Sequence, residues 1–202
     1  MFLKTDSLIT NRQKMKYYVI FGPPGAGKGT QATAISEKYN LKHISTGELL
    51  RKEMAAGTEL GRKARELIDA GCLVPDEVVE GMIESEFARN RDVEGFLLDG
   101  YPRTLAQAES LENLLGKTGE SVNAVVSLMI PDATIYERIR HRAGIEGRED
   151  DCKDEVIATR ISTYHKLTEP IISFYRAEGK YSEIDGLGSI EEVRERIFRV
   201  LG

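Results

Sequence analysis

The stretch Gly22-Pro23-Pro24-Gly25-Ala26-Gly27-Lys28-Gly29-Thr30 decides how the rest of the chain is interpreted. It follows the apolar run 17–21, which is typical of a buried strand, and it precedes a helical pattern over residues 30–39. A strand that turns through several glycines into a helix presents consecutive backbone N–H groups to one point, where Lys28 adds a positive charge. The spacing predicts a phosphate-binding loop, because a turn without a ligand would need only one glycine.

One position departs from the general pattern of such loops. Ser or Thr usually follows the lysine directly, and its hydroxyl reaches a magnesium ion. Here that position is Gly29, and Thr30 comes one residue later. We therefore expect the metal to depend more on water and on a carboxylate elsewhere. Asp99, which ends the apolar segment 95–98, is the candidate; the alternative is an aspartate that only caps the next turn.

Composition indicates a globular protein with one main core, because 41% of the 202 residues are hydrophobic and 30% are charged. The net charge of −5 argues against diffuse binding to nucleic acid. Cys72 and Cys152 are too few for a disulfide framework and form no C-x-x-C pair, which favours a reducing cytoplasm and no structural zinc. No apolar run approaches the roughly 18 residues of a membrane span. The polar residues 1–14 are either an extension outside the fold or a targeting segment.

Strand and helix patterns alternate along the chain, which predicts an α/β fold with a parallel sheet and helices on both faces. Ligands of such sheets bind at the carboxyl ends of the strands. Thr46 is expected to cap the first helix of a small helical insertion. We expect strands at 17–21, 41–45, 95–99, 122–130 and 181–184, and helices at 28–39, 46–57, 58–70, 75–90, 104–115, 132–142, from 153 with a break at Pro170, and 189–201.

Several arginines fall in loops or on helix faces near that edge of the sheet. Taken singly, each would be a solvated surface charge. Together, converging guanidinium groups stabilise the charge that spreads over a transferring phosphoryl group. Two of them stand four residues apart and share one helix face. The set is Arg51, Arg103, Arg138, Arg142, Arg148 and Arg160.

On these motifs the chain resembles the adenylate kinases over about residues 16–202. The segments that carry the resemblance are GPPGAGKGTQ (22–31), ISTGELLR (44–51), GCLVP (71–75), GFLLDGYPRT (95–104), GREDD (147–151) and DGLG (185–188). The resemblance implies a P-loop NTPase-type core of residues 15–45, 74–142 and 152–202. It also implies a helical NMP-binding insertion at 46–73 and a lid at 143–151. The lid is short and has no Cys or His set, so it resembles the class without zinc.

The resemblance also implies roles for individual residues. Those expected to bind ATP are Gly25, Ala26, Gly27, Lys28, Gly29, Thr30, Arg138, Arg142 and the backbone of Gly188. Those expected to bind AMP are Thr46, Arg51, Cys72, Leu73, Val74, Gly100, Tyr101, Pro102, Arg103, Gln107, Arg148 and Arg160. The expected catalytic set is Lys28, Arg103, Arg142, Arg148 and Arg160, with Asp99 holding Mg²⁺ through water. The segment from Arg148 to Arg160 is one residue longer than the resemblance predicts, so the extra residue either shifts Arg160 or lies in the loop.

Two positions favour AMP as the acceptor over UMP or CMP. Pyrimidine enzymes of the resembled family tend to carry Ala at position 46 and Asn after the Pro-Arg pair, whereas this chain has Thr46 and Thr104. The amide of Gln107 can donate and accept, as the adenine edge requires. The implied reaction is ATP + AMP ⇌ 2 ADP in a cytoplasmic monomer that binds neither nucleic acid nor membrane. The rival hypothesis is a P-loop switch protein, which would not need Arg51, Arg103 and Gln107 for a second nucleotide.

Overall fold

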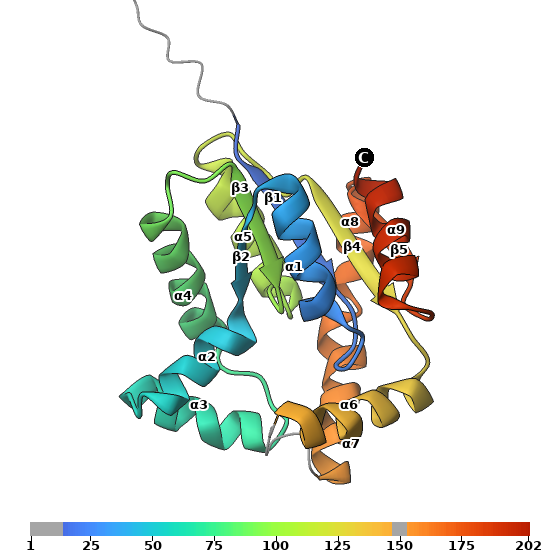
Figure 1. Ribbon diagram of the computed structural model, residues 1–202. Coiled ribbons are helices and arrows are strands. Elements are labelled where there is room, and N and C mark those ends of the chain that lie inside the picture. The colour runs from blue at the N-terminus through green and yellow to red at the C-terminus, as the bar shows by residue number, and fades with distance from the viewer. Residues whose placement is uncertain (1–13, 147–152) are drawn as a thin grey trace, which may run out of the picture.

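A computed structural model describes residues 14–146 and 153–202, and its strands form one five-stranded sheet in the order β2-β3-β1-β4-β5 (Figure 1). All neighbouring strands pair in parallel, so the predicted parallel α/β sheet is confirmed. The strands are β1 Lys16–Phe21, β2 Lys42–Ser45, β3 Gly95–Asp99, β4 Ala124–Met129 and β5 Tyr181–Asp185.

The helices connect the strands and cover both faces of the sheet. They are α1 Lys28–Tyr39, α2 Thr46–Ala55, α3 Glu59–Asp69, α4 Asp76–Arg89, α5 Leu105–Gly116, α6 Asp132–Glu146, α7 Asp154–Thr163, α8 Ile171–Ala177 and α9 Ile190–Leu201. In Figure 1 the strands point toward α2 and α3 on one side and toward α6 and α7 on the other. Within the described ranges, none of the helices combines the length and apolar character that a membrane span requires.

The alternation of side chains along each strand divides the core into two apolar layers. In β1, Tyr17, Val19 and Phe21 pack with α4, α5 and α8, whereas Ile20 packs with α1 and α9 on the other face. Because both faces of a parallel sheet are covered, the central strands read as continuous apolar runs, as β3 does. This scaffold fixes the carboxyl ends of β1, β2 and β3 side by side.

The parts of the chain beyond those strand ends have packing of their own. Ile135 and Ile139 of α6 pack with Ile157 and Ile161 of α7 in a small buried cluster that is separate from the two layers. Helices α2 and α3 cross so closely that a Cβ at Gly61 would clash with the backbone carbonyl of Glu53. Only glycine fits at that crossing.

Beyond shifts of one residue, several features differ from the sequence-based expectation. Ser45, not Thr46, caps α2, because the Ser45 hydroxyl accepts from the Glu48 N–H while the Thr46 hydroxyl is used elsewhere. Helix α6 continues to residue 146, four residues into the expected loop. Strand β4 is shorter than 122–130. A π-helical turn, Tyr164–Thr168 (η2), comes before the expected break at Pro170, which caps α8.

Candidate active site

The loop between β1 and α1 has the backbone that its glycines predicted. Gly25 and Gly27 have φ angles of +78° and +88°, a region that other residues rarely adopt. A Cβ at Gly25 would lie 3.1 Å from Ile139 Cγ1, so the loop packs directly on α6. The Lys28 ammonium donates to the carbonyls of Gly22 at 2.8 Å and Pro23 at 2.9 Å. These two bonds tie the end of the loop back to its beginning. The result is a preformed anion cradle at the N-terminus of α1.

Lys28 lies in an environment that disfavours its own charge. Burial lowers the pKa of the ammonium group to about 8, Asp99 opposes this shift, and three arginines lower the pKa further. Those arginines are Arg103, Arg142 and Arg160. Because these cations repel one another, an anionic ligand that binds among them would relieve the repulsion.

Asp99 ends β3 in the same cavity and is 8% exposed. Burial would raise the pKa of its carboxyl group. The hydrogen bond to His43 and the charges of Lys28 and Arg103 outweigh that effect and hold the pKa below its ordinary value. His43 Nε2 lies 3.5 Å from Asp99 Oδ2. Asp99 is therefore an ionised carboxylate beside the phosphate cradle.

The opposite side of the cavity is organised around the carbonyl oxygen of Gly100. The Thr46 hydroxyl donates to it at 2.8 Å and Arg103 Nε donates at 2.8 Å. Gly100 has a φ of +76°, and a Cβ there would lie 2.9 Å from both Thr46 Oγ1 and an Arg103 guanidinium nitrogen. The absence of a side chain at position 100 thus lets Arg103 fold back against Thr46. Thr168 donates from η2 to the Arg103 carbonyl at 2.9 Å.

Gln107 lies in the first turn of α5 and is 2% exposed. Its carbonyl oxygen accepts from the Arg103 N–H at 2.7 Å, and its amide nitrogen donates to Asp76 Oδ1 at 2.7 Å. Its side chain also lines the cavity. The amide is therefore held by two partners while facing the space where a ligand would bind.

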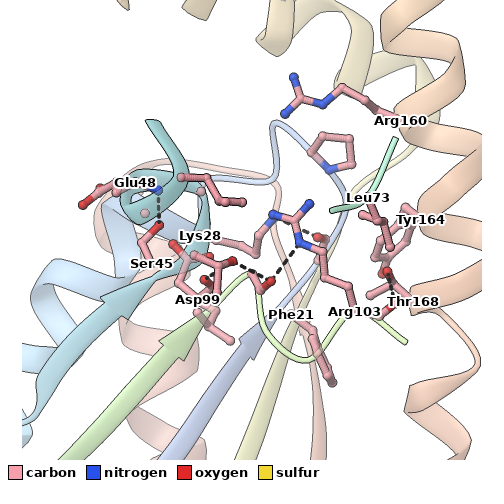
Figure 2. A pocket seen from close by; sticks show the side chains of 18 of the residues that line it. Phe21, Lys28, Ser45, Glu48, Leu73, Asp99, Arg103, Arg160, Tyr164 and Thr168 are labelled. Atoms are coloured by element: carbon pink, nitrogen blue, oxygen red, sulfur yellow. Dashed lines mark hydrogen bonds between the residues drawn. The ribbon is translucent and has the colours of Figure 1, made fainter. Parts of the chain in front are cut away.

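These groups share one cavity of about 740 Å³, which is in the size range of small-molecule sites. Figure 2 shows Arg160 extending from α7 into this cavity, across from Lys28 and Arg103. Most of the residues predicted from the sequence line it: Gly25, Gly27, Lys28, Gly29, Thr30, Thr46, Arg51, Cys72, Leu73, Val74, Asp99, Gly100, Pro102, Arg103, Gln107, Arg138, Arg142 and Arg160.

Comparison with known proteins agrees with this geometry. A model of the family described as adenylate kinase matches residues 20–180, which is more than half of the chain. The chain belongs to the adenylate kinase family. Membership makes it a nucleoside monophosphate kinase with adenylate kinase activity, the transfer of a phosphoryl group between ATP and AMP.

Individual relatives are similar over almost their whole length. An adenylate kinase of Xanthomonas euvesicatoria pv. vesicatoria is 48% identical over 184 residues, which cover 91% of this chain and 98% of the relative. An adenylate kinase of Xanthomonas axonopodis pv. citri has the same identity and coverage. One from Stenotrophomonas maltophilia is 45% identical over 183 residues, covering 91% of this chain and 97% of the relative.

Four of the predicted residues are not among those that line the adenylate kinase cavity. Ala26 is buried, and Tyr101 is buried with its hydroxyl donating to the main-chain carbonyl of Gln107 at 3.3 Å. Gly188 is exposed and comes two residues after Gly186, whose carbonyl accepts from Arg138 at 3.2 Å. Arg148 lies outside the described residues, as does most of the expected lid 143–151.

His43 and Asp76 are two of the residues in contact with the adenylate kinase site that the sequence did not predict. His43 contacts Asp99, and it precedes Ser45 by two residues, so the alternation of a strand puts both on one face. Asp76 lies at the start of the helix predicted over 75–90, and its carboxylate accepts from the Gln107 amide. The alternation of side chains along β2 could have indicated that His43 faces the site. No sequence signal indicates Asp76, because its contact depends on how α4 and α5 pack.

Proposed function

We propose that the cavity binds ATP and AMP with their phosphates facing each other, and that ATP + AMP ⇌ 2 ADP occurs between them. The observation that carries this proposal is the meeting of Lys28 with Arg103, Arg142 and Arg160 in one cavity. One nucleotide bound by a switch protein would engage the loop between β1 and α1 alone. Cations contributed by the loop, by the β3–α5 turn and by α6 and α7 fit the larger charge of two phosphate chains.

In this proposal the donor ATP lies on the loop side. Its phosphates would accept hydrogen bonds from the backbone of residues 25–30 and from Lys28, which follows the transferring group. Arg138 and Arg142 project from α6, which packs on the loop through Ile139. We propose that these two arginines contact ATP from the α6 side of the cavity. The Gly188 backbone is the proposed contact for the adenine of ATP.

The acceptor AMP would lie against the opposite wall. Arg51 and Arg103 are the proposed partners of its phosphate, with Arg160 reaching over from α7. The backbone of residues 72–74 and the amide of Gln107 would contact its base. Thr46 shapes this wall through its bond to the Gly100 carbonyl. Arg148 belongs to the same proposal on the strength of the family resemblance.

The donor set also fits Mg²⁺. A carboxylate that stays ionised beside the phosphate cradle is the type of ligand that this ion takes through water. We propose Asp99 as that group. When bound, the ion would neutralise charge on the phosphate oxygens. We further propose that the chain holds no structural zinc; among residues 14–146 and 153–202 no group of three or more His, Cys, Asp or Glu side chains could hold a metal.

The transfer needs few chemical groups from the protein. The attacking atom is an oxygen of the AMP phosphate, which is already an anion, so no general base is required. As the new bond to that oxygen forms, the bond between the γ-phosphorus and the β–γ bridging oxygen of ATP breaks, and the bridging oxygen leaves with ADP. Lys28, Arg103, Arg142, Arg148 and Arg160 would stabilise the charge on the equatorial oxygens of the transferring group. Closure of the insertion 46–73 over AMP would exclude water, which would otherwise hydrolyse ATP.

The testing experiment measures ADP formation from Mg-ATP alone and with AMP, UMP, CMP or GMP. We expect AMP to give the highest kcat/KM and ATP to be stable without an acceptor. A preference for UMP or CMP would identify a pyrimidine nucleotide kinase. Hydrolysis of ATP that AMP does not stimulate would favour the switch protein.

We also propose a cytoplasmic monomer that binds neither nucleic acid nor membrane. The negative net charge disfavours binding to nucleic acid, and the proposed reaction involves only small nucleotides as substrates. Light scattering coupled to gel filtration tests the monomeric state: a mass near 22.5 kDa is expected, and a stable larger species would contradict it.

A further inference from the structure

We propose that Asp76 is a positioning residue that fixes which way the Gln107 amide faces. It thereby makes the acceptor site select adenine over a base with the reversed hydrogen-bonding edge. The inference rests on the proposed placement of AMP against Gln107. It concerns a residue that would touch the substrate only through another side chain.

The two bonds of the Gln107 amide leave it one orientation. Asp76 offers a carboxylate, which only accepts, and its Oδ1 lies 2.7 Å from Gln107 Nε2. Arg103 offers a backbone N–H, which only donates, and its nitrogen lies 2.7 Å from Gln107 Oε1. If the amide turned over, an oxygen would face the carboxylate and an N–H would face the Arg103 N–H. The orientation of an amide is assigned from such partners, and here both agree.

Asp76 is itself held in place. Its second oxygen, Oδ2, accepts from the Thr104 hydroxyl at 2.8 Å, and that hydroxyl also accepts from the Gln107 N–H at 3.1 Å. Asp76 is the first residue of α4, where a negative charge interacts favourably with the helix dipole. The half-buried carboxylate is therefore a fixed acceptor beside the buried Gln107 side chain.

The locked amide has one hydrogen and one lone pair left for a ligand, since each end has used one of two. Adenine presents an acceptor, N1, beside a donor, its 6-amino group. Hypoxanthine presents the reverse, a donor N1–H beside an acceptor O6, with no other change in shape. An amide in one orientation complements only one of these edges, whereas an amide free to turn over complements both. A site with a fixed pattern rejects the reversed one because buried polar groups would be left unpaired.

The sharpest test compares the variant Asp76→Asn with wild type. The asparagine side chain has the same shape but can donate as well as accept, so it removes one of the two constraints on Gln107 and leaves the Arg103 N–H as the other. Glu77→Gln is the matched control, because Glu77 is exposed, lies in the same first turn of α4 and loses the same charge. Steady-state kcat/KM is measured for AMP and for inosine monophosphate at saturating Mg-ATP.

We expect wild type and Glu77→Gln to prefer AMP strongly. In Asp76→Asn the ratio of kcat/KM for AMP to that for inosine monophosphate should fall at least about tenfold, the size of one lost hydrogen bond to a charged group. The change should lie mainly in KM for AMP, with KM for ATP unaltered. Asp76→Ala, which removes the acceptor without adding a donor, should lower the ratio in the same direction.

Other outcomes overturn the inference. A ratio that stays at the wild-type value in both variants, or equal losses for the two acceptors, would mean that Asp76 only ties α4 to α5. A wild-type protein that uses the two acceptors equally would also contradict it. If AMP does not stimulate wild-type turnover at all, the placement of AMP is wrong, and that failure is visible before any variant is made.

Discussion

Gly29 and Asp99 face each other across the mouth of the phosphate-binding loop, and a Cβ at Gly29 would lie 4.0 Å from Asp99 Oδ2. The hydroxyl that usually follows the lysine of such a loop would therefore point at this carboxylate. In the proposed magnesium site, Asp99 is the oxygen group at the place that this hydroxyl would otherwise occupy. The lack of a side chain at Gly29 and the carboxylate at Asp99 are therefore best considered together.

Asp99→Asn is expected to lower kcat/KM at least about tenfold and to raise the Mg²⁺ concentration that gives half-maximal activity. The reason is the loss of the ionised carboxylate beside the cradle. The measurement is a Mg²⁺ titration of ADP formation. Glu183→Gln, an exposed carboxylate on β5, serves as the control. An unchanged Mg²⁺ requirement in Asp99→Asn would place the metal elsewhere.

Arg103→Ala should reduce kcat at least about 100-fold, because its guanidinium group lies in the cavity opposite Lys28 and is proposed to bind the acceptor phosphate. Initial-rate kinetics with saturating ATP and AMP check this. Arg89→Ala is the control, since the Arg89 side chain is 72% exposed on α4. Turnover close to wild type would show that the acceptor phosphate binds at another place.

The lowered pKa of Lys28 predicts a specific pH dependence of stability in the ligand-free protein. Below about pH 8 the amine is charged in both the folded and the unfolded chain, so it contributes no slope. Between about 8 and the ordinary value of 10.5, the unfolded chain holds a proton that the folded protein has lost. The free energy of unfolding should therefore rise with pH there, by at most about 1.4 kcal/mol per unit.

Urea unfolding from pH 7 to pH 10 measures this slope. Other groups also titrate in this range, so the comparison is with Lys28→Met, in which the Lys28 contribution is absent. The difference in unfolding free energy between wild type and Lys28→Met should shift in favour of wild type as pH rises above 8. If the unfolding free energies of the two proteins changed with pH in parallel, the charged form of Lys28 would not be destabilised by its surroundings.

Metal removal should distinguish a magnesium ion needed for activity from a zinc ion needed for folding. Chelation by EDTA is expected to abolish activity by removing Mg²⁺, and excess Mg²⁺ should restore it fully. The melting temperature of the nucleotide-free protein should not change on chelation, because the proposal contains no structural zinc. Elemental analysis that finds one zinc per chain would contradict this.

The sequence predicted best the features that depend on local chemistry. The start of α1 follows from Gly27 and Lys28, and the end of β3 follows from an apolar run closed by Asp99. These positions are determined by residues that are neighbours in the chain. The same holds for Ser189, which caps α9 in a capping box with Glu192.

Features that depend on packing could not be predicted in this way. Thr46 has the side chain of a helix cap, but its hydroxyl donates to Gly100, which follows another strand. Ser45 therefore caps α2 in its place. The bond between Asp76 and Gln107 likewise requires two helices to lie side by side. In both cases the local pattern was compatible with the fold but did not contain the partner.

The separate cluster of Ile135, Ile139, Ile157 and Ile161 has a consequence for adaptation to temperature. It joins α6 to α7, which carry Arg142 and Arg160, while the layers on the sheet hold the rest of the protein together. Trimming a methyl group there, as in Ile157→Val, should cost about 1 kcal/mol of local packing. We therefore expect Ile157→Val to lower the temperature optimum of catalysis by more than it lowers the temperature of denaturation.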